Sequence, residues 1–600
     1  AQAATLYWVG GDGDSWNSAA DWSTSDPGSC NDGGGDAGAA PTSSDVIVFD
    51  ADCDSGMTID ANLDVSGIDI QSGYAGTITQ NSTYTIDVGT SGWTQADGTF
   101  TGGDSAIEID GTVNISGGAF TSTSSTLTWG GTSTDGYNVT IGSSATFIHN
   151  SGSVVFDGRN TTFDFDTSLT LNNLELRASS FNHYLALNSG DTLSVDGTLS
   201  LTTGRLNGQG ILDANGTIVV DAGFGTNNFG DGQSGNILID GTDDQSFTIP
   251  DGAKLPHLIL NNANTTIDFA DGASAGIAWG LDLQAGTFTA PSGTLYMGTA
   301  GNDFRGNDWI NMSGGTFNHN NGTIDFGPST LGEGNAGEEG VINVPSSITL
   351  NNVIFDVSTT QDSVIASGDT VIVEGTLTHS GGRLSGNIVQ AQGDVVISDD
   401  AVGGTATLQF TGTNNQTYTD NGADEPDGDI TINKSSGTVT LASNADWDAT
   451  DQDVTITSGT LDLAGYDLST GTFTVSAGAT VQLEGGETIS GTLAFDSAAN
   501  AIYDGTGTYA SGLVLGDAYN NITFNGSGGS WTLDAALDIG GDLAITAGTL
   551  VDGGNNITIE GSWSNSDTYT GTGTVTFDAT STAIITTGGV GDGNDFENMS

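Results

Sequence analysis

Two short acidic segments contain the residue types that bind a hard metal ion. They are NGADEPDGD (421–429) and ADWDATDQD (445–453), and GGDGDSW (10–16) is a weaker candidate. Carboxylate oxygens at alternate positions of a short loop suit Ca²⁺, which takes about six to eight oxygen ligands in a flexible geometry. The sequence therefore predicts Ca²⁺ and no other cofactor. The predicted ligands are Asp424, Glu425, Asp427, Asp429, Asp446, Asp448, Asp451, Asp453, Asp12 and Asp14.

Solvated turn aspartates are the alternative interpretation of these segments. The chain has 74 acidic residues, of which 11 are Glu. The short carboxylate of Asp bonds nearby backbone amides and favours turns, so much of this acidity is expected at corners between strands. In a chain so rich in Asp, acidic clusters also arise without a bound ion.

Catalytic chemistry has little support in the sequence. An enzyme acting on acidic polysaccharide needs basic groups to hold substrate and stabilise negative charge, but the few Arg are dispersed. Arg205 and Arg383 fall at equivalent repeat positions, which indicates a structural role. Paired carboxylates of an inverting glycosidase stay open as an alternative. The chain is predicted not to be an enzyme. The five His, which show no metal-ligand spacing, are His149, His183, His257, His319 and His379.

The net charge restricts the partners. Seven basic residues stand against 74 acidic ones, a formal net charge of −67. A surface of this charge repels nucleic acid and anionic lipid. No apolar run reaches about 18 residues, so no membrane span is expected.

The two cysteines, Cys30 and Cys53, flank a glycine-rich segment near the N-terminus. A disulfide closing that loop would stabilise by roughly 3–4 kcal/mol and implies an oxidising compartment. The alternative is a pair of buried free thiols. The chain starts with AQA rather than Met, as after removal of a secretory signal. A secreted or cell-surface protein is expected.

The elements that position these residues are short strands. Runs such as DVIVF and LTLNNLEL are rich in β-branched residues and bounded by Gly, Asn or Asp, which predicts an all-β chain. A polar-apolar-x-apolar element recurs at spacings of 84, 95, 77, 92 and 77 residues. It occurs at 173–176, 257–260, 352–355, 429–432 and 521–524, and begins again at 598–600.

Longer phrases repeat at about twice that distance. SGDTLSVDGTLSLTTGRLNG at 189 returns as SGDTVIVEGTLTHSGGRLSG at 367, and GTDDQSFT at 241 returns as GTNNQTYT at 412. Short strands with glycine corners about ten residues apart predict an elongated parallel β-solenoid, in which each coil buries its apolar face against the next. Tandem immunoglobulin-like sandwiches are the alternative.

The repeat spacing predicts the division of the chain. An N-terminal tryptophan-rich β module with the disulfide covers 1–66, and degenerate coils cover 67–172. The repeats are 173–256, 257–351, 352–428, 429–520 and 521–597, and 598–600 starts a further, interrupted repeat.

Two segments resemble a known group of proteins. YWVGGDGDSWNSAADWS, with Trp8, Trp16 and Trp22, resembles an N-terminal module, and YNNITFNGSGGSWTL (519–533) with the repeats after it is similar to those of large secreted and surface proteins of bacteria. Such proteins are adhesin-like β-solenoids without a catalytic motif. The resemblance implies a fold and a location, not a reaction.

The solenoid and the charge together predict a function. Coils of about 20 residues rising about 4.8 Å each would place one charge every ~2 Å along the axis. Divalent cations or salt would relieve this repulsion. We expect a structural protein that self-associates, end to end or laterally, into a filament, sheath or surface layer. The alternatives are an adhesin stalk that displays a binding tip and a polysaccharide-active enzyme. Extracellular polysaccharide is a further expected partner.

Overall fold

The computed structural model describes residues 4–600 with several gaps. These are Pro27, 32–33, 131–135, Thr167, Phe181, 226–234, 299–307, 328–338, Ala423, 511–512, Val514, 516–518, 589–595 and the side chain of Tyr137. The chain folds as two compact units. The first contains the described residues up to Gly322, and the second contains those from Thr323 onward.

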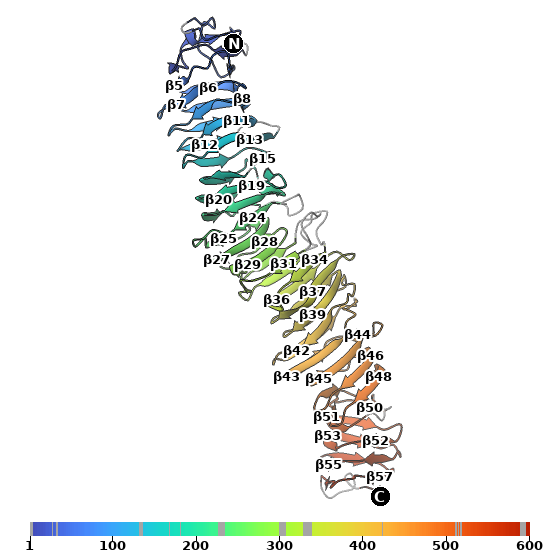
Figure 1. Cartoon of the computed structure of the whole chain (residues 1–600). Helices are drawn as coiled ribbons and strands as arrows, with labels where there is room; N and C mark the ends of the chain where they lie inside the picture. The colour runs from blue at the N-terminus through green and yellow to red at the C-terminus, as the bar shows by residue number, and fades with distance from the viewer. Residues whose placement is uncertain are drawn as a thin grey trace. The chain divides into compact units, whose positions relative to one another are not determined.

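The predicted all-β solenoid is confirmed. Strands of successive turns pair in parallel (Figure 1), and the chain makes about 23 turns. Parallel pairing between consecutive turns excludes the alternative of tandem sandwiches, whose sheets are antiparallel. The turns are longer than the expected length of about 20 residues, since 600 residues make about 23 turns, and their lengths vary. Thr370 faces Ile388 one turn later, whereas Ile324 faces Val353.

Three parallel ladders make up the turns in part of the first unit. One contains β14 (Ser153–Phe156), β17 (Asn173–Arg177), β20 (Thr198–Thr203) and β23 (Thr217–Val220). A second contains β15 (Thr161–Phe165), β18 (Tyr184–Leu187) and β21 (Arg205–Gly208). The third contains β16 (Leu169–Leu171), β19 (Thr192–Val195), β22 (Ile211–Ala214), β24 (Asn236–Ile239) and β27 (His257–Phe269).

The core consists of apolar side chains stacked in register. Strand residues alternate between interior and surface, so each strand contributes every second side chain to the core. Because the pairing is parallel and in register, like side chains contact each other from one turn to the next. The third ladder, for example, stacks five buried residues: Leu169, Leu193, Leu212, Ile237 and Leu258.

Each recurring polar-apolar-x-apolar element lies at or next to the start of a strand. These strands are β17, β27, β36 (Asn352–Asp356), β43 (Ile430–Leu441), β51 (Asn521–Thr532) and β59 (Asn598–Met599). The element at 598–600 pairs as the strand of a further turn, because β59 faces β57 (Thr574–Phe577) in parallel.

Buried glutamines satisfy the backbone where the chain turns a corner. Gln416 Nε2 donates to the carbonyls of Ala391 and Gly393 at 2.9 and 2.7 Å. Gln245, its counterpart in the repeated phrase, donates to the carbonyls of Ala214 and Gly216. A buried carbonyl group without a hydrogen-bond partner costs stability, so the need for this glutamine explains why the phrase is repeated.

A second polar residue completes each of these corners. Asn262 Nδ2 donates to Gln245 Oε1 at 2.9 Å. At the corresponding position of the later repeat, Lys434 Nζ donates to Gln416 Oε1 and, at 3.1 Å, to the carbonyl of Thr411. Lys434 is 1% exposed, and burial lowers the pKa of its ammonium group. The lysine therefore has a structural role.

The N-terminal module covers one end of the first unit's stack. Strand β1 (Thr5–Trp8) pairs in parallel with β4 (Val46–Phe49) and antiparallel with β3 (Trp22–Ser23). A short 3₁₀ helix (Ala19–Asp21) leads into β3. The three tryptophans of the resemblance, Trp8, Trp16 and Trp22, are all buried. Strand β4 in turn pairs with β6 (Leu63–Ile70), so the module is continuous with the stack.

Candidate acidic binding pocket

The pocket lies in the second unit, where three successive turns pass the same corner. Strand β42 (Gln416–Asp420) pairs with the end of β43, and β44 (Ala445–Trp447) pairs with β46 (Leu468–Val475). This register places the end of β42 and the residues that follow β43 and β45 (Asp453–Asp462) one above another. Asp420, Ser443 and Tyr466 occupy this corner at intervals of 23 residues.

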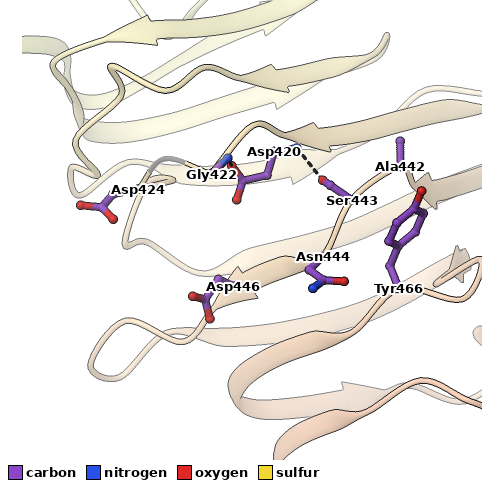
Figure 2. A pocket seen from close by; sticks show the side chains of 8 residues that line it. All are labelled: Asp420, Gly422, Asp424, Ala442, Ser443, Asn444, Asp446 and Tyr466. Carbon is purple, nitrogen blue, oxygen red and sulfur yellow. Dashed lines mark hydrogen bonds between the residues drawn. The ribbon is translucent and has the colours of Figure 1, made fainter.

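An open pocket of about 560 Å³ lies along these corners (Figure 2). Its wall contains carboxylates, an amide, a hydroxyl and one aromatic ring. The lining residues are Asp420, Gly422, Asp424, Ala442, Ser443, Asn444, Asp446 and Tyr466. Of the predicted calcium ligands, Asp424 and Asp446 are therefore brought together from two different segments, and both are exposed.

Hydrogen bonds within and between turns order the polar wall. The Asp420 amide donates to Ser443 Oγ at 2.7 Å, and the Gly422 amide donates to Asp420 Oδ1 at 2.8 Å. One turn later, the Asp467 amide donates to Asn444 Oδ1 at 3.1 Å. The backbone thus presents these side chains in a defined arrangement.

Tyr466 is presented by a tight turn. Ala464 and Gly465 both have positive φ, 50° and 86°, and the Tyr466 amide donates to the Leu463 carbonyl at 2.9 Å. The Gly465 amide donates to Glu487 Oε1 at 3.1 Å. The side chain of Tyr466 is 38% exposed, so its ring is accessible from the pocket.

Glu425 differs from the other predicted ligands because it is buried, with 6% exposure. Burial, together with the negative charges of Asp420, Asp446 and Asp424, raises the pKa of Glu425 to about 8. At neutral pH the side chain is therefore largely protonated. A bound cation would favour its ionised form, since an opposite charge nearby lowers the pKa of a carboxyl group.

The remaining predicted ligands lie elsewhere. Asp429 Oδ1 accepts the Asp453 amide at 3.1 Å, and Asp453 Oδ1 accepts the Thr472 amide at 2.9 Å. These two carboxylates link successive turns, as expected of corner aspartates. Residues that lie exposed on the surface of the same unit are Asp427, Asp448 and Asp451.

The N-terminal candidates also bond backbone amides. Asp12 Oδ1 accepts the Gly56 amide at 2.9 Å, and Asp14 Oδ2 accepts the Gly11 amide at 2.7 Å. A group that sequence reasoning missed lies nearby. Asp26, Asp50 and Asp52 have carboxylate oxygens within 4.8 Å of one another. Burial and the charges of its two neighbours raise the pKa of Asp50. The sequence signal was the pair Asp50 and Asp52, but the approach of Asp26 depends on the fold.

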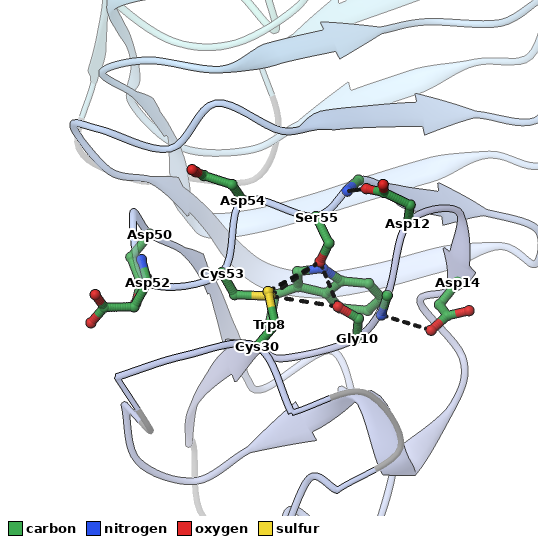
Figure 3. Close-up of a disulfide and its surroundings, with 12 residues drawn as sticks. Trp8, Gly10, Asp12, Asp14, Cys30, Asp50, Asp52, Cys53, Asp54 and Ser55 are labelled. Carbon is green, nitrogen blue, oxygen red and sulfur yellow. Dashed lines mark hydrogen bonds between the residues drawn. A yellow bond between two sulfur atoms is a disulfide. The ribbon is translucent and has the colours of Figure 1, made fainter.

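The disulfide lies against the N-terminal core. The structure contains the Cys30–Cys53 bond that the cysteine spacing predicts, with a Cα–Cα distance of 4.5 Å. Figure 3 shows it beside Trp8 and Ser55. Ser55 Oγ accepts Trp8 Nε1 at 3.1 Å and contacts Cys53 Sγ at 3.1 Å. The bond thus fastens the loop before β4 to the buried tryptophans.

The alternative of an inverting glycosidase requires two carboxyl groups that act together, and one pair of buried aspartates interacts in this structure. Asp325 and Asp356 are 8% and 9% exposed. Burial and, to a lesser extent, the negative charge of Asp356 raise the pKa of Asp325 to about 7.

The two arginines at equivalent repeat positions have a structural role. Arg383 forms two hydrogen bonds of 2.7 Å with the Asp362 carboxylate, and Arg205 donates to Asn182 Oδ1 at 3.1 Å.

Comparison with known proteins gives no relative. No family model, curated protein or solved structure matches the chain. Within the part of the chain that the structure describes, no helix has the length and apolar character needed to cross a membrane.

Proposed function

We propose that this chain is an extracellular structural protein of a cell surface, of the adhesin-like β-solenoid type, which associates side by side through divalent cations. The observation that carries the proposal is the charge that the solenoid concentrates along its axis. The 67 formal net negative charges are spread over about 23 turns. With a rise of about 4.8 Å per turn, this is about one charge per 1.6 Å, close to duplex DNA at about one per 1.7 Å.

Such a charge density requires counterions. Like polyanions repel one another in water, and multivalent cations both lower this repulsion and link neighbouring carboxylates. The group of Asp26, Asp50 and Asp52 offers carboxylate oxygens within 4.8 Å of one another, close enough to share an ion. We assign Ca²⁺ as the linking ion.

The N-terminal module favours lateral over end-to-end association at that end of the first unit. An uncovered edge strand is a template for pairing with another chain. Here β3 pairs with the outer edge of β1. A cap of this kind blocks strand addition, so the acidic flanks are the better contact surface.

The test is assembly of the purified protein with and without CaCl₂, measured by light scattering and negative-stain electron microscopy. We expect ordered lateral arrays in millimolar Ca²⁺ that dissolve in chelator. NaCl at equal ionic strength is the control, because it screens charge without linking carboxylates. Monomers in every condition would contradict the proposal, and arrays that form equally in NaCl would remove the calcium link.

A further inference from the structure

We propose that the pocket around Tyr466 binds a neutral sugar of an extracellular glycan. The ring of Tyr466 would stack on one face of a pyranose, and Asn444 and Asp446 would bond its hydroxyl groups. This inference does not depend on the proposed assembly, since a binding pocket and an assembly contact are separate properties of the surface.

The first argument is the exposure of Tyr466. Two aromatic side chains on the neighbouring strands, Trp447 and Tyr418, are buried and pack against each other. Among the described residues, Tyr466 is the one aromatic residue that is exposed, at 38%. An exposed aromatic ring has an apolar face that suits a flat, partly apolar ligand and a hydroxyl that stays in water.

The second argument is that the turn that carries the ring is ordered by hydrogen bonds. The turn at Ala464 and Gly465 is closed by the bond from the Tyr466 amide to the Leu463 carbonyl and by the bond to Glu487. A surface that is already ordered loses little conformational entropy when a ligand binds.

The third argument is the chemistry of the rest of the wall. Asn444 Oδ1 is engaged by the Asp467 amide, which leaves the Nδ2 group to donate. Asp446 and Asp424 carry exposed carboxylates, which only accept hydrogen bonds when ionised. Figure 2 shows Asn444 between Asp446 and Tyr466. A ligand with many hydroxyl donors and an apolar face matches this arrangement.

The charge selects among glycans. The wall has three carboxylates, Asp420, Asp424 and Asp446, on a chain of net charge −67. Uronate or sulfated sugars would be repelled, so the ligand is neutral. The volume of about 560 Å³ falls within the ~300–1,000 Å³ of small-molecule sites and is too small for a long chain to be enclosed.

The experiment uses the whole chain and a panel of neutral hexose oligosaccharides, with oligogalacturonate as the anionic comparison. Binding is measured by calorimetry and by saturation-transfer NMR, in Ca²⁺ and in chelator. We expect a neutral oligosaccharide to bind and the oligogalacturonate not to bind. Tyr466→Ala and Asp446→Asn should each weaken binding about tenfold or more.

Two variants are matched controls. Tyr466→Phe keeps the ring, and Asp448→Asn changes an exposed acid that does not line the pocket, so both should bind within about twofold of the parent chain. Equal melting temperatures of all variants would show that the fold is intact. Failure of every neutral oligosaccharide to bind overturns the proposal. Binding that Tyr466→Ala leaves unchanged overturns it as well.

Discussion

Trp8 lies opposite Trp22 in the antiparallel pairing of β1 and β3, with ring centroids 5.2 Å apart and the rings edge to face. Both rings also contact Phe49 of β4. The tryptophans therefore fasten the outermost strand of the first unit to the parallel stack. This contact explains why a strand of two residues can cover the edge of β1.

Replacing Trp22 by Ala should uncover that edge. Loss of a buried tryptophan costs about 3–5 kcal/mol, and the substitution also removes the hydrogen bond of 2.7 Å from Trp22 Nε1 to the Trp16 carbonyl. We expect the variant to associate at concentrations where the parent chain, in chelator, is monomeric, as measured by light scattering. Trp93→Ala is the control, because Trp93 is equally buried but lies within the stack. Equal association of the two variants would contradict the capping role.

Removal of the disulfide should loosen the N-terminal module alone. The bond closes a loop with a sequence separation of 23 residues, for which chain entropy predicts roughly 3–4 kcal/mol. In the Cys30→Ser, Cys53→Ser variant we expect faster amide hydrogen exchange in β1 and β4. Strand β10 (Ile107–Ile109), several turns along, should exchange at the parent rate because solenoid turns contact only their neighbours. Unchanged exchange in the module would show that the bond contributes little.

Lys434 should be replaceable by Asn but not by Met. Lys434→Met leaves Gln416 Oε1 without its donor in the core, at a cost of about 1–3 kcal/mol. Lys434→Asn should cost less, since Asn262 makes the same contact at the equivalent corner. Denaturant unfolding of the second unit measures the difference. Equal stability of the two variants would indicate that the polar contact is unimportant.

Glu425 should make the second unit less stable as pH rises. Its folded-state pKa of about 8 exceeds the unfolded value of 4.5, so the folded chain binds the proton more tightly. The resulting stability is fully present below pH 4.5 and is lost as pH rises through 8. Glu425→Gln stays neutral at every pH. Its melting temperature, measured by differential scanning calorimetry, should therefore exceed that of the parent chain by an amount that grows as the pH rises from 4.5 to 8. Asp427→Asn, at an exposed neighbour, should show no such trend. Parallel pH curves for parent and Glu425→Gln would be inconsistent with a buried, protonated Glu425.

The solenoid could be predicted from local patterns. The alternation in β19 and the glycine corners are visible within a few residues, and the repeated phrases at 241 and 412 mark equivalent turns. The disulfide followed from two cysteines flanking one loop. What the phrases did not reveal is why they repeat, since the bonds of Gln245 and Gln416 reach carbonyls in an earlier turn.

The composition and periodicity of this sequence by themselves determined an acidic all-β chain whose strands stack in parallel, because strand pattern and repeat period are local properties. Only the tertiary structure decided which corners coincide. Asp424 and Asp446 share a pocket with Asp420 and Tyr466, whereas Asp429 and Asp453 bond backbone amides. Turn length varies from one coil to the next, so residues far apart in sequence meet only where the backbone register aligns them.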